Sequence, residues 1–230
     1  MRLLVLGAGQ QGSACAYDLL SRTGAEVVLA DRRTDSIPDF LRPFPRERLR
    51  FERIDVSDMA AVRRLMEGVD ATMCALPYYL NPAMSEAAIR ARSHFCDLGG
   101  NTEIVLRQKQ HAAEARARGV SVIADCGLAP GMVNILAQEG IRRLERARSV
   151  RIMVGGLPQH PEPPVNYQVV YSLEGVLDYY TTASWVLRDS VPVRVEALSE
   201  VEEIDFPGAG RLEAFHTAGG LSTMAQRYAG

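Results

Sequence analysis

The sequence predicts an α/β fold in which an N-terminal doubly wound parallel sheet is followed by an α+β domain. Strand-length apolar runs alternate with helical segments through the first half of the chain, which is typical of a parallel sheet. A glycine-rich turn joins the first apolar run to the first helical segment. After residue 125 this alternation stops, so we expect two domains, at 1–125 and 126–230.

Apolar runs in the first domain predict strands at residues 2–6, 26–30, 49–55, 71–75, 94–98 and 120–124. The segments between them predict helices at 13–22, 59–67, 82–93 and 102–118, where apolar residues recur at helical spacing. Asn81 and Pro82 favour a helix start, because an N-cap residue precedes proline at the first helical position. Segment 33–48 contains Pro38, Pro43 and Pro45 and predicts a loop.

The second domain has a different pattern of elements. Residues 132–147 and 173–188 predict helices, and residues 149–154, 166–171, 191–198, 201–206 and 212–218 predict strands. The first two of these strands are separated by a proline-rich loop at 157–165. Strands joined by short connections predict an antiparallel or mixed sheet with helices on one face.

The turn after the first strand reads Gly-Ala-Gly-Gln-Gln-Gly at residues 7–12, with a strand before it and a helix after it. In this context G-x-G-x-x-G predicts a dinucleotide-binding Rossmann fold. Gly7 permits the tight turn, Gly9 lets a pyrophosphate approach the backbone, and Gly12 lets the helix pack on the strand. Gln10 and Gln11 lie within this turn, and the helix that follows offers free N–H groups at its N-terminus to the phosphates.

Asp31 ends the second strand, at the spacing expected for a carboxylate that accepts hydrogen bonds from the adenosine ribose. A carboxylate there repels the extra phosphate of NADP, so we expect NAD rather than NADP. Arg32 and Arg33 leave NADP open, because a guanidinium beside this position can hold a phosphate. The residues expected to bind the cofactor are Gly7, Gly9, Gln10, Gln11, Gly12, Asp31, Asp55, Ala75, Leu76 and Pro77. For Asp55, a turn or N-cap role is an equal alternative.

The composition excludes several other functions. The net charge of −2 and the pI near 6.1 give no electrostatic reason to expect nucleic-acid or membrane binding. The first apolar run is too short for a signal peptide, and no run approaches membrane-spanning length. Cys15, Cys74, Cys96 and Cys126 stand far apart in sequence, which predicts reduced thiols in a cytoplasmic protein and no metal site.

Several longer phrases occur in a recognisable order. They are C-A-L-P-Y-Y at 74–79, D-L-G-G at 97–100, D-C-G-L-A-P-G at 125–131, V-G-G-L-P at 154–158, Y-S-L-E-G at 171–175 and L-E-A-F-H-T-A-G-G at 212–220. Together they resemble the saccharopine dehydrogenase-like oxidoreductases, most closely the members that dehydrogenate lysine. The resemblance implies NAD-dependent oxidative deamination of the lysine ε-amine, a small-molecule amino-acid substrate and a homodimer. Proteins of this type continue beyond residue 230, so the resemblance also implies a C-terminally truncated second domain.

Amine oxidation requires a neutral amine and therefore a base, or a dry pocket that lowers the pKa of the amine. We expect Tyr167 and His216 to be catalytic, although a core tyrosine and a structural histidine are the alternatives. Tyr79, Asp125, Tyr167 and Thr217 are the residues expected to contact substrate. Two other functions stay open: a saccharopine- or carboxynorspermidine-type reductase, and a truncated NAD-binding protein without catalysis.

Overall fold

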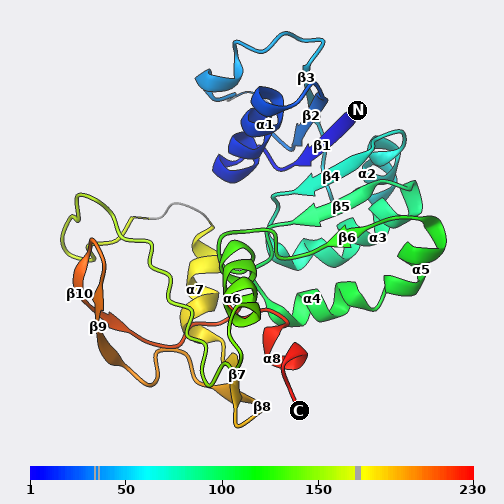
Figure 1. Ribbon diagram of the computed structural model, residues 1–230. Coiled ribbons are helices and arrows are strands. Elements are labelled where there is room, and N and C mark those ends of the chain that lie inside the picture. The colour runs from blue at the N-terminus through cyan, green and yellow to red at the C-terminus, as the bar shows by residue number, and fades with distance from the viewer. Residues whose placement is uncertain (34, 36, 169–171) are drawn as a thin grey trace. The chain divides into compact units, whose positions relative to one another are not determined.

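The computed structural model describes residues 1–33, 35, 37–168 and 172–230 (Figure 1). The chain forms two compact units, one of residues 1–99 with 103–126 and the other of residues 100–102 with 127–230. No helix within the described ranges is long and apolar enough to cross a membrane.

The first unit is built on a six-stranded parallel sheet in the order β3-β2-β1-β4-β5-β6. Its strands are β1 (Arg2–Leu6), β2 (Glu26–Asp31), β3 (Leu49–Arg53), β4 (Ala71–Cys74), β5 (His94–Asp97) and β6 (Val122–Ile123). The order reverses between β1 and β4, and at such a switch point doubly wound sheets bind their ligands. The predicted fold class is therefore confirmed, with β3 to β6 shorter than expected.

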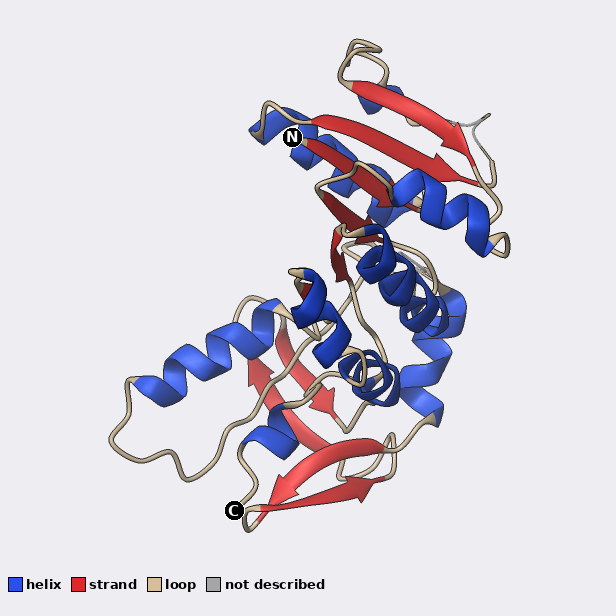
Figure 2. Cartoon of the chain, turned by 90° about the vertical axis from the view of Figure 1, so that its right-hand side faces the viewer, coloured by secondary structure: helices blue, strands red, loops and turns tan. Residues whose placement is uncertain are grey.

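Helices cover both faces of this sheet (Figure 2). The helices are α1 (Gln10–Arg22), α2 (Met59–Met66), α3 (Asn81–Ala91), α4 (Thr102–Lys109) and α5 (Ala112–Arg118), with short 3-10 turns η1 (Asp39–Leu41) and η2 (Tyr78–Leu80). The α2 and α3 side buries Val62, Met66 and Met84, and the α1 side buries Ala16 and Leu20. The single helix predicted at 102–118 is wrong, because a turn at Gln110 and His111 divides it.

The second unit holds helices α6 (Met132–Arg142), α7 (Leu173–Thr181) and α8 (Met224–Arg227). Its strands are β7 (Ser184–Arg188), β8 (Val191–Val195), β9 (Glu202–Phe206) and β10 (Gly210–Ala214). They pair as two separate antiparallel ribbons, β7 with β8 and β9 with β10, instead of one mixed sheet.

Four predicted elements of this unit need correction. The helix expected at 173–188 ends at Thr181, and its second half is β7, because Asp189 and Ser190 both have positive φ and form a two-residue hairpin turn. No strand forms at 149–154 or at 166–168, and residues 169–171 of the latter prediction lie outside the described residues. The helix expected at 132–147 ends at Arg142.

Candidate cofactor site

The glycine turn after β1 has no space for side chains at two of its positions. Gly7 has a φ of +95°, and a Cβ there would lie 2.9 Å from the carbonyl oxygen of Ala75. A Cβ on Gly12 would lie only 1.8 Å from the carbonyl oxygen of Gly7. Around Gly9, by contrast, a Cβ would meet no atom within 4 Å. The turn is therefore tight on its protein side and open at Gly9, the position where a pyrophosphate must approach the backbone.

Helix α1 starts directly from this turn, with Gly9 as its N-cap. The first turn of the helix carries no acidic residue that would compete with a phosphate. The Ser13 N–H donates to the carbonyl of Gly9, and the Ser13 hydroxyl donates to the carbonyl of Ala8 at 3.0 Å. The N–H groups that precede Ser13 in the helix have no intrahelical acceptor and are the donors that an anion uses.

Asp31 lies beside the glycine turn although 23 residues separate them in sequence. Its Oδ2 accepts a hydrogen bond from the Ala8 N–H at 2.7 Å, and its Oδ1 accepts one from the Arg33 N–H at 2.9 Å. Each carboxylate oxygen has a second lone pair that a ribose hydroxyl can use. The structure therefore brings together the glycine turn and the carboxylate that the sequence predicts for the ribose.

Two further predicted segments lie at the carboxyl edge of the sheet. Ala75 follows β4 directly, and its N–H donates to the carbonyl of Leu6 at 2.8 Å. Leu76 is half-buried and Pro77 is exposed, and Tyr79 is 49% exposed in η2, with its ring packed edge-on against Tyr78.

Asp55, just beyond β3, forms a local turn. Its Oδ1 accepts from the N–H and the hydroxyl of Ser57, at 2.9 and 2.7 Å. The backbone hydrogen bond from Ser57 is the main cause that lowers the pKa of this exposed carboxyl, with a smaller contribution from the charge of Arg32. The N-cap of α2 is instead Asp58, which accepts from the Ala60 and Ala61 N–H groups.

A buried carboxylate that the sequence analysis did not single out organises the end of β5. Asp97 is fully buried and accepts hydrogen bonds from the Gln108 side chain at 2.8 Å, the Gly99 N–H at 2.8 Å and the Asp125 N–H at 3.3 Å. Burial raises the pKa of this carboxyl, and the three hydrogen bonds oppose the rise. The D-L-G-G phrase was the available signal, but the partner Gln108 could not be inferred from it.

Three predicted site residues lie in the second unit, and their surroundings differ from one another. They are Tyr167, His216 and Thr217. His216 Nε2 lies 3.2 Å from Glu200 Oε2, and the same oxygen pairs with Arg188. Arg188 first, and His216 second, lower the pKa of Glu200. Tyr167 is half-buried and Thr217 is exposed.

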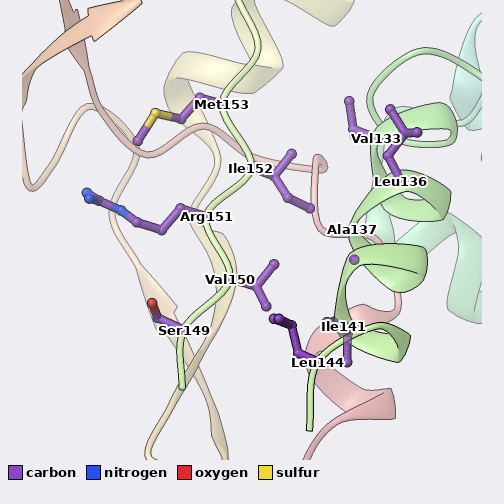
Figure 3. Close-up of a pocket in the computed structure, with 11 residues that line it drawn as sticks. Val133, Leu136, Ala137, Ile141, Leu144, Ser149, Val150, Arg151, Ile152 and Met153 are labelled. Carbon is purple, nitrogen blue, oxygen red and sulfur yellow. The ribbon is translucent and has the colours of Figure 1, made fainter. Parts of the chain in front are cut away.

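A hollow of about 380 Å³ lies between α6 and the extended segment 149–153 of the second unit (Figure 3). Val150 and Ile152 point toward the helix, whereas Arg151 points away from it and pairs with Glu202. The remaining lining is mainly aliphatic, including Val133, Leu136 and Ile141. Neither Tyr167 nor His216 lines this hollow. An aliphatic lining without converging polar groups does not suit an amino-acid substrate.

Comparison with known proteins identifies both units. Residues 3–123 match the saccharopine dehydrogenase NADP binding domain, and residues 127–228 match the saccharopine dehydrogenase C-terminal domain. The chain is 27% identical to mitochondrial alpha-aminoadipic semialdehyde synthase of Mus musculus over 90% of its own length and 23% of the relative. It is 25% identical to saccharopine dehydrogenase [NADP(+), L-glutamate-forming] of Schizosaccharomyces pombe over 76% of its own length and 39% of that protein.

The fold has a solved counterpart. Saccharopine dehydrogenase (L-Glu forming) from Saccharomyces cerevisiae superposes with a TM-score of 0.71 at 18% identity, over 93% of this chain and 49% of that one. The chain therefore spans about half or less of the relatives that it matches. The glycine turn, the doubly wound sheet and the family match together indicate a nicotinamide dinucleotide as cofactor. The chain belongs to the saccharopine dehydrogenase family.

Proposed function

We propose that this chain binds NAD and oxidatively deaminates the ε-amine of L-lysine or of a close diamino acid. The observation that supports the cofactor assignment is the 2.7 Å hydrogen bond from the Ala8 N–H to Asp31, which joins the glycine turn to the ribose carboxylate. Gln10, Gln11 and Gly12 would offer N–H groups to the pyrophosphate. When bound, NAD supplies the hydride acceptor.

The substrate amine must lose a proton before its carbon can give up a hydride, so the protein must supply a base. We assign this role to Tyr167 or His216, and Glu200 orients the His216 ring through the contact at Nε2. Tyr79, Asp125 and Thr217 are assigned to substrate contact. Among the side chains of the described residues, no group of three or more His, Cys, Asp and Glu is arranged to hold a metal ion.

A saccharopine-type reaction is the second candidate, and the names of the relatives favour it. This chemistry acts on a secondary amine that bears additional carboxylates, which need cationic partners. In the second unit Arg188 and Arg211 are paired with Glu200 and Glu203 on the surface. These paired guanidinium groups offer no evident cluster for extra carboxylates, which favours the smaller substrate.

The direct test is NADH formation when the purified chain is mixed with NAD and L-lysine at alkaline pH, with saccharopine and NADP in parallel reactions. Turnover of lysine with NAD supports the proposal. Turnover of saccharopine but not of lysine would favour the saccharopine-type reaction. If neither amine is oxidised while NAD still raises the melting temperature, the chain binds the nucleotide without catalysing the reaction.

Replacing Asp31 is expected to change the choice of cofactor. Asp31→Ser removes the charge that repels a 2′-phosphate and the acceptor for the ribose hydroxyls. Hydrogen bonds to a charged group contribute roughly 1.5–3 kcal/mol, so NAD affinity should fall about 10- to 100-fold, whereas NADP affinity should fall less or rise. Titration calorimetry with both nucleotides measures the ratio of NAD affinity to NADP affinity.

The matched control for this experiment is Asp39→Asn, because Asp39 is an exposed acidic residue in η1 that pairs with Arg42 on the surface. It removes the same charge away from the glycine turn and should leave both affinities unchanged. An unchanged ratio of NAD to NADP affinity in Asp31→Ser would show that Asp31 does not select the cofactor.

We also propose that the chain forms a homodimer in the cytoplasm. Helix α6 leaves Ile135 and Leu136 71% and 62% exposed, and such apolar surface favours association. Light scattering at micromolar concentration should give a mass above that of the 25.2 kDa chain, and a clean monomer would contradict the dimer.

A further inference from the structure

Two sulfur-bearing side chains lie together near the carboxyl ends of β4 and β5. The Sγ of Cys96 lies 3.3 Å from the Sδ of Met73, which is its register partner on the neighbouring strand. Both residues are half-buried. They lie on the sheet face against which α1 packs, since Met73 belongs to the core on that side.

A second cysteine is brought to the same place by a reversal of the chain after β6. Asp125 has a φ of +59°, and the next residue, Cys126, donates its N–H to the carbonyl of Asp97 at 2.7 Å. Its Sγ lies 3.4 Å from the carbonyl oxygen of Ile123, which is the register partner of Cys96 in β6. The Cys126 thiol thus lies over the end of β6 beside Cys96, although 30 residues separate the two in sequence.

The two thiols affect each other's ionisation in opposite directions and differ in exposure. A hydrogen bond from Cys96 lowers the pKa of the Cys126 thiol, and the same interaction, followed by burial, raises the pKa of Cys96. Cys126 is exposed, so a small oxidant can reach it. Cys74 is different, because it is 1% exposed and burial raises the pKa of its thiol to about 12.

We propose that Cys96 and Cys126 form a reversible disulfide, in which exposed Cys126 reacts first with a peroxide and Cys96 resolves the product. The Cys126 thiolate attacks one peroxide oxygen, the O–O bond breaks, and a sulfenic acid and a hydroxide result. Cys96 then attacks the Cys126 sulfur, the S–O bond breaks, and water leaves as the S–S bond forms. The two cysteines lose two electrons and two protons, and the peroxide is reduced to water. A dithiol reductant restores both thiols.

The proposed disulfide does not depend on the dinucleotide assignment, because it requires only the thiol pair at the ends of β5 and β6. A disulfide here joins the last residue of the first unit to the strand that carries Asp97. We therefore expect the oxidised protein to resist opening of this edge of the sheet. Its melting temperature should rise on oxidation and return on reduction.

The test is intact-mass analysis of the full chain after hydrogen peroxide treatment and alkylation of the remaining thiols. Disulfide formation should lower the protein mass by ~2 Da and protect two of the four cysteines from alkylation. Peptide mapping should find Cys96 linked to Cys126, and dithiothreitol should restore four alkylated sites. In Cys96→Ser, Cys126 should instead accumulate as a sulfenic acid that reacts with dimedone.

Cys15→Ser is the matched control, because Cys15 is another half-buried free cysteine and takes no part in the proposed pairing. This variant should form the same disulfide at the same rate. Loss of the linked product in Cys15→Ser, with retention in Cys126→Ser, would overturn the proposed pairing. Oxidation of Cys126 to sulfinic acid without any linked product would overturn the disulfide itself.

Discussion

Gly12→Ala is expected to abolish dinucleotide binding and to destabilise the first unit. The new Cβ would lie 1.8 Å from the carbonyl oxygen of Gly7, a backbone atom that cannot rotate away as a side-chain end would. Relief requires α1 to move off β1, where Ala16 and Leu20 are buried on the sheet. Overpacking of this kind costs about 1–3 kcal/mol or more, so the melting temperature should fall and NAD should no longer raise it.

Two other glycines separate the effect on folding from the effect on binding. At Gly24 an added Cβ meets nothing within 4 Å, so Gly24→Ala should change neither stability nor binding. At Gly9 the Cβ also meets no protein atom, but it would occupy the approach of the pyrophosphate. Gly9→Ala should therefore fold normally but bind NAD more weakly than the wild type. Full NAD affinity in Gly9→Ala would contradict the assignment of this turn to the cofactor.

Asp97→Ala is expected to cause the second large loss, here of folding stability. The substitution leaves the buried Gln108 amide and the partly buried Gly99 and Asp125 N–H groups without their acceptor. Each buried donor left unpaired costs about 1–3 kcal/mol, so chemical denaturation should show a loss of roughly 3 kcal/mol or more. Asp55→Ala is the control for stability, because this exposed carboxylate accepts its hydrogen bonds from Ser57 in a local turn.

Asp97→Asn tests the charge separately from the hydrogen bonds. An asparagine oxygen can still accept from Gly99 and Asp125, and the buried Oε1 of Gln108, which has no partner in the described part of the chain, can accept from the new amide after a flip. Because burial raises the pKa of Asp97 in the folded state, its contribution to stability is fully present below the ordinary aspartate pKa. It is lost as the pH rises through the raised value. The stability of the wild type relative to Asp97→Asn should therefore fall as the pH rises through the acidic range, and a pH-independent difference would contradict this account.

The parallel half of the fold could be predicted from the sequence because its central strands are buried on both faces. Residues 3–6 of β1 and 27–30 of β2 are continuous buried runs, which are typical of strands covered on both faces in a parallel sheet. The second half of the chain has a weaker sequence pattern for its helices and strands. The turn at Asp189 and Ser190 contains no glycine, and the apolar segment before it continues directly from α7, so the sequence pattern predicts helix where β7 forms.

The candidate site could also be predicted only in part from the sequence. The glycine turn and Asp31 have a local spacing that follows from their roles, and the structure places them in contact. The bonds that hold Asp97 and the contact of Cys96 with Cys126 depend on which strands become neighbours. Such long-range pairs leave no periodic pattern in the sequence. Cys96 and Cys126, which are 30 residues apart in sequence, illustrate this limit.

The bond between Ala8 and Asp31 has a consequence for the entropy of cofactor binding. This hydrogen bond joins two segments that are 23 residues apart in sequence. Folding of the protein therefore orders both the glycine turn and the Asp31 carboxylate before the nucleotide binds. Ordering a flexible side chain on association costs roughly 0.5–1.5 kcal/mol, and a site that is ordered beforehand avoids that cost. Nucleotide association should then approach rigid-body docking, with a rate limited by diffusion and orientation rather than by rearrangement of the turn.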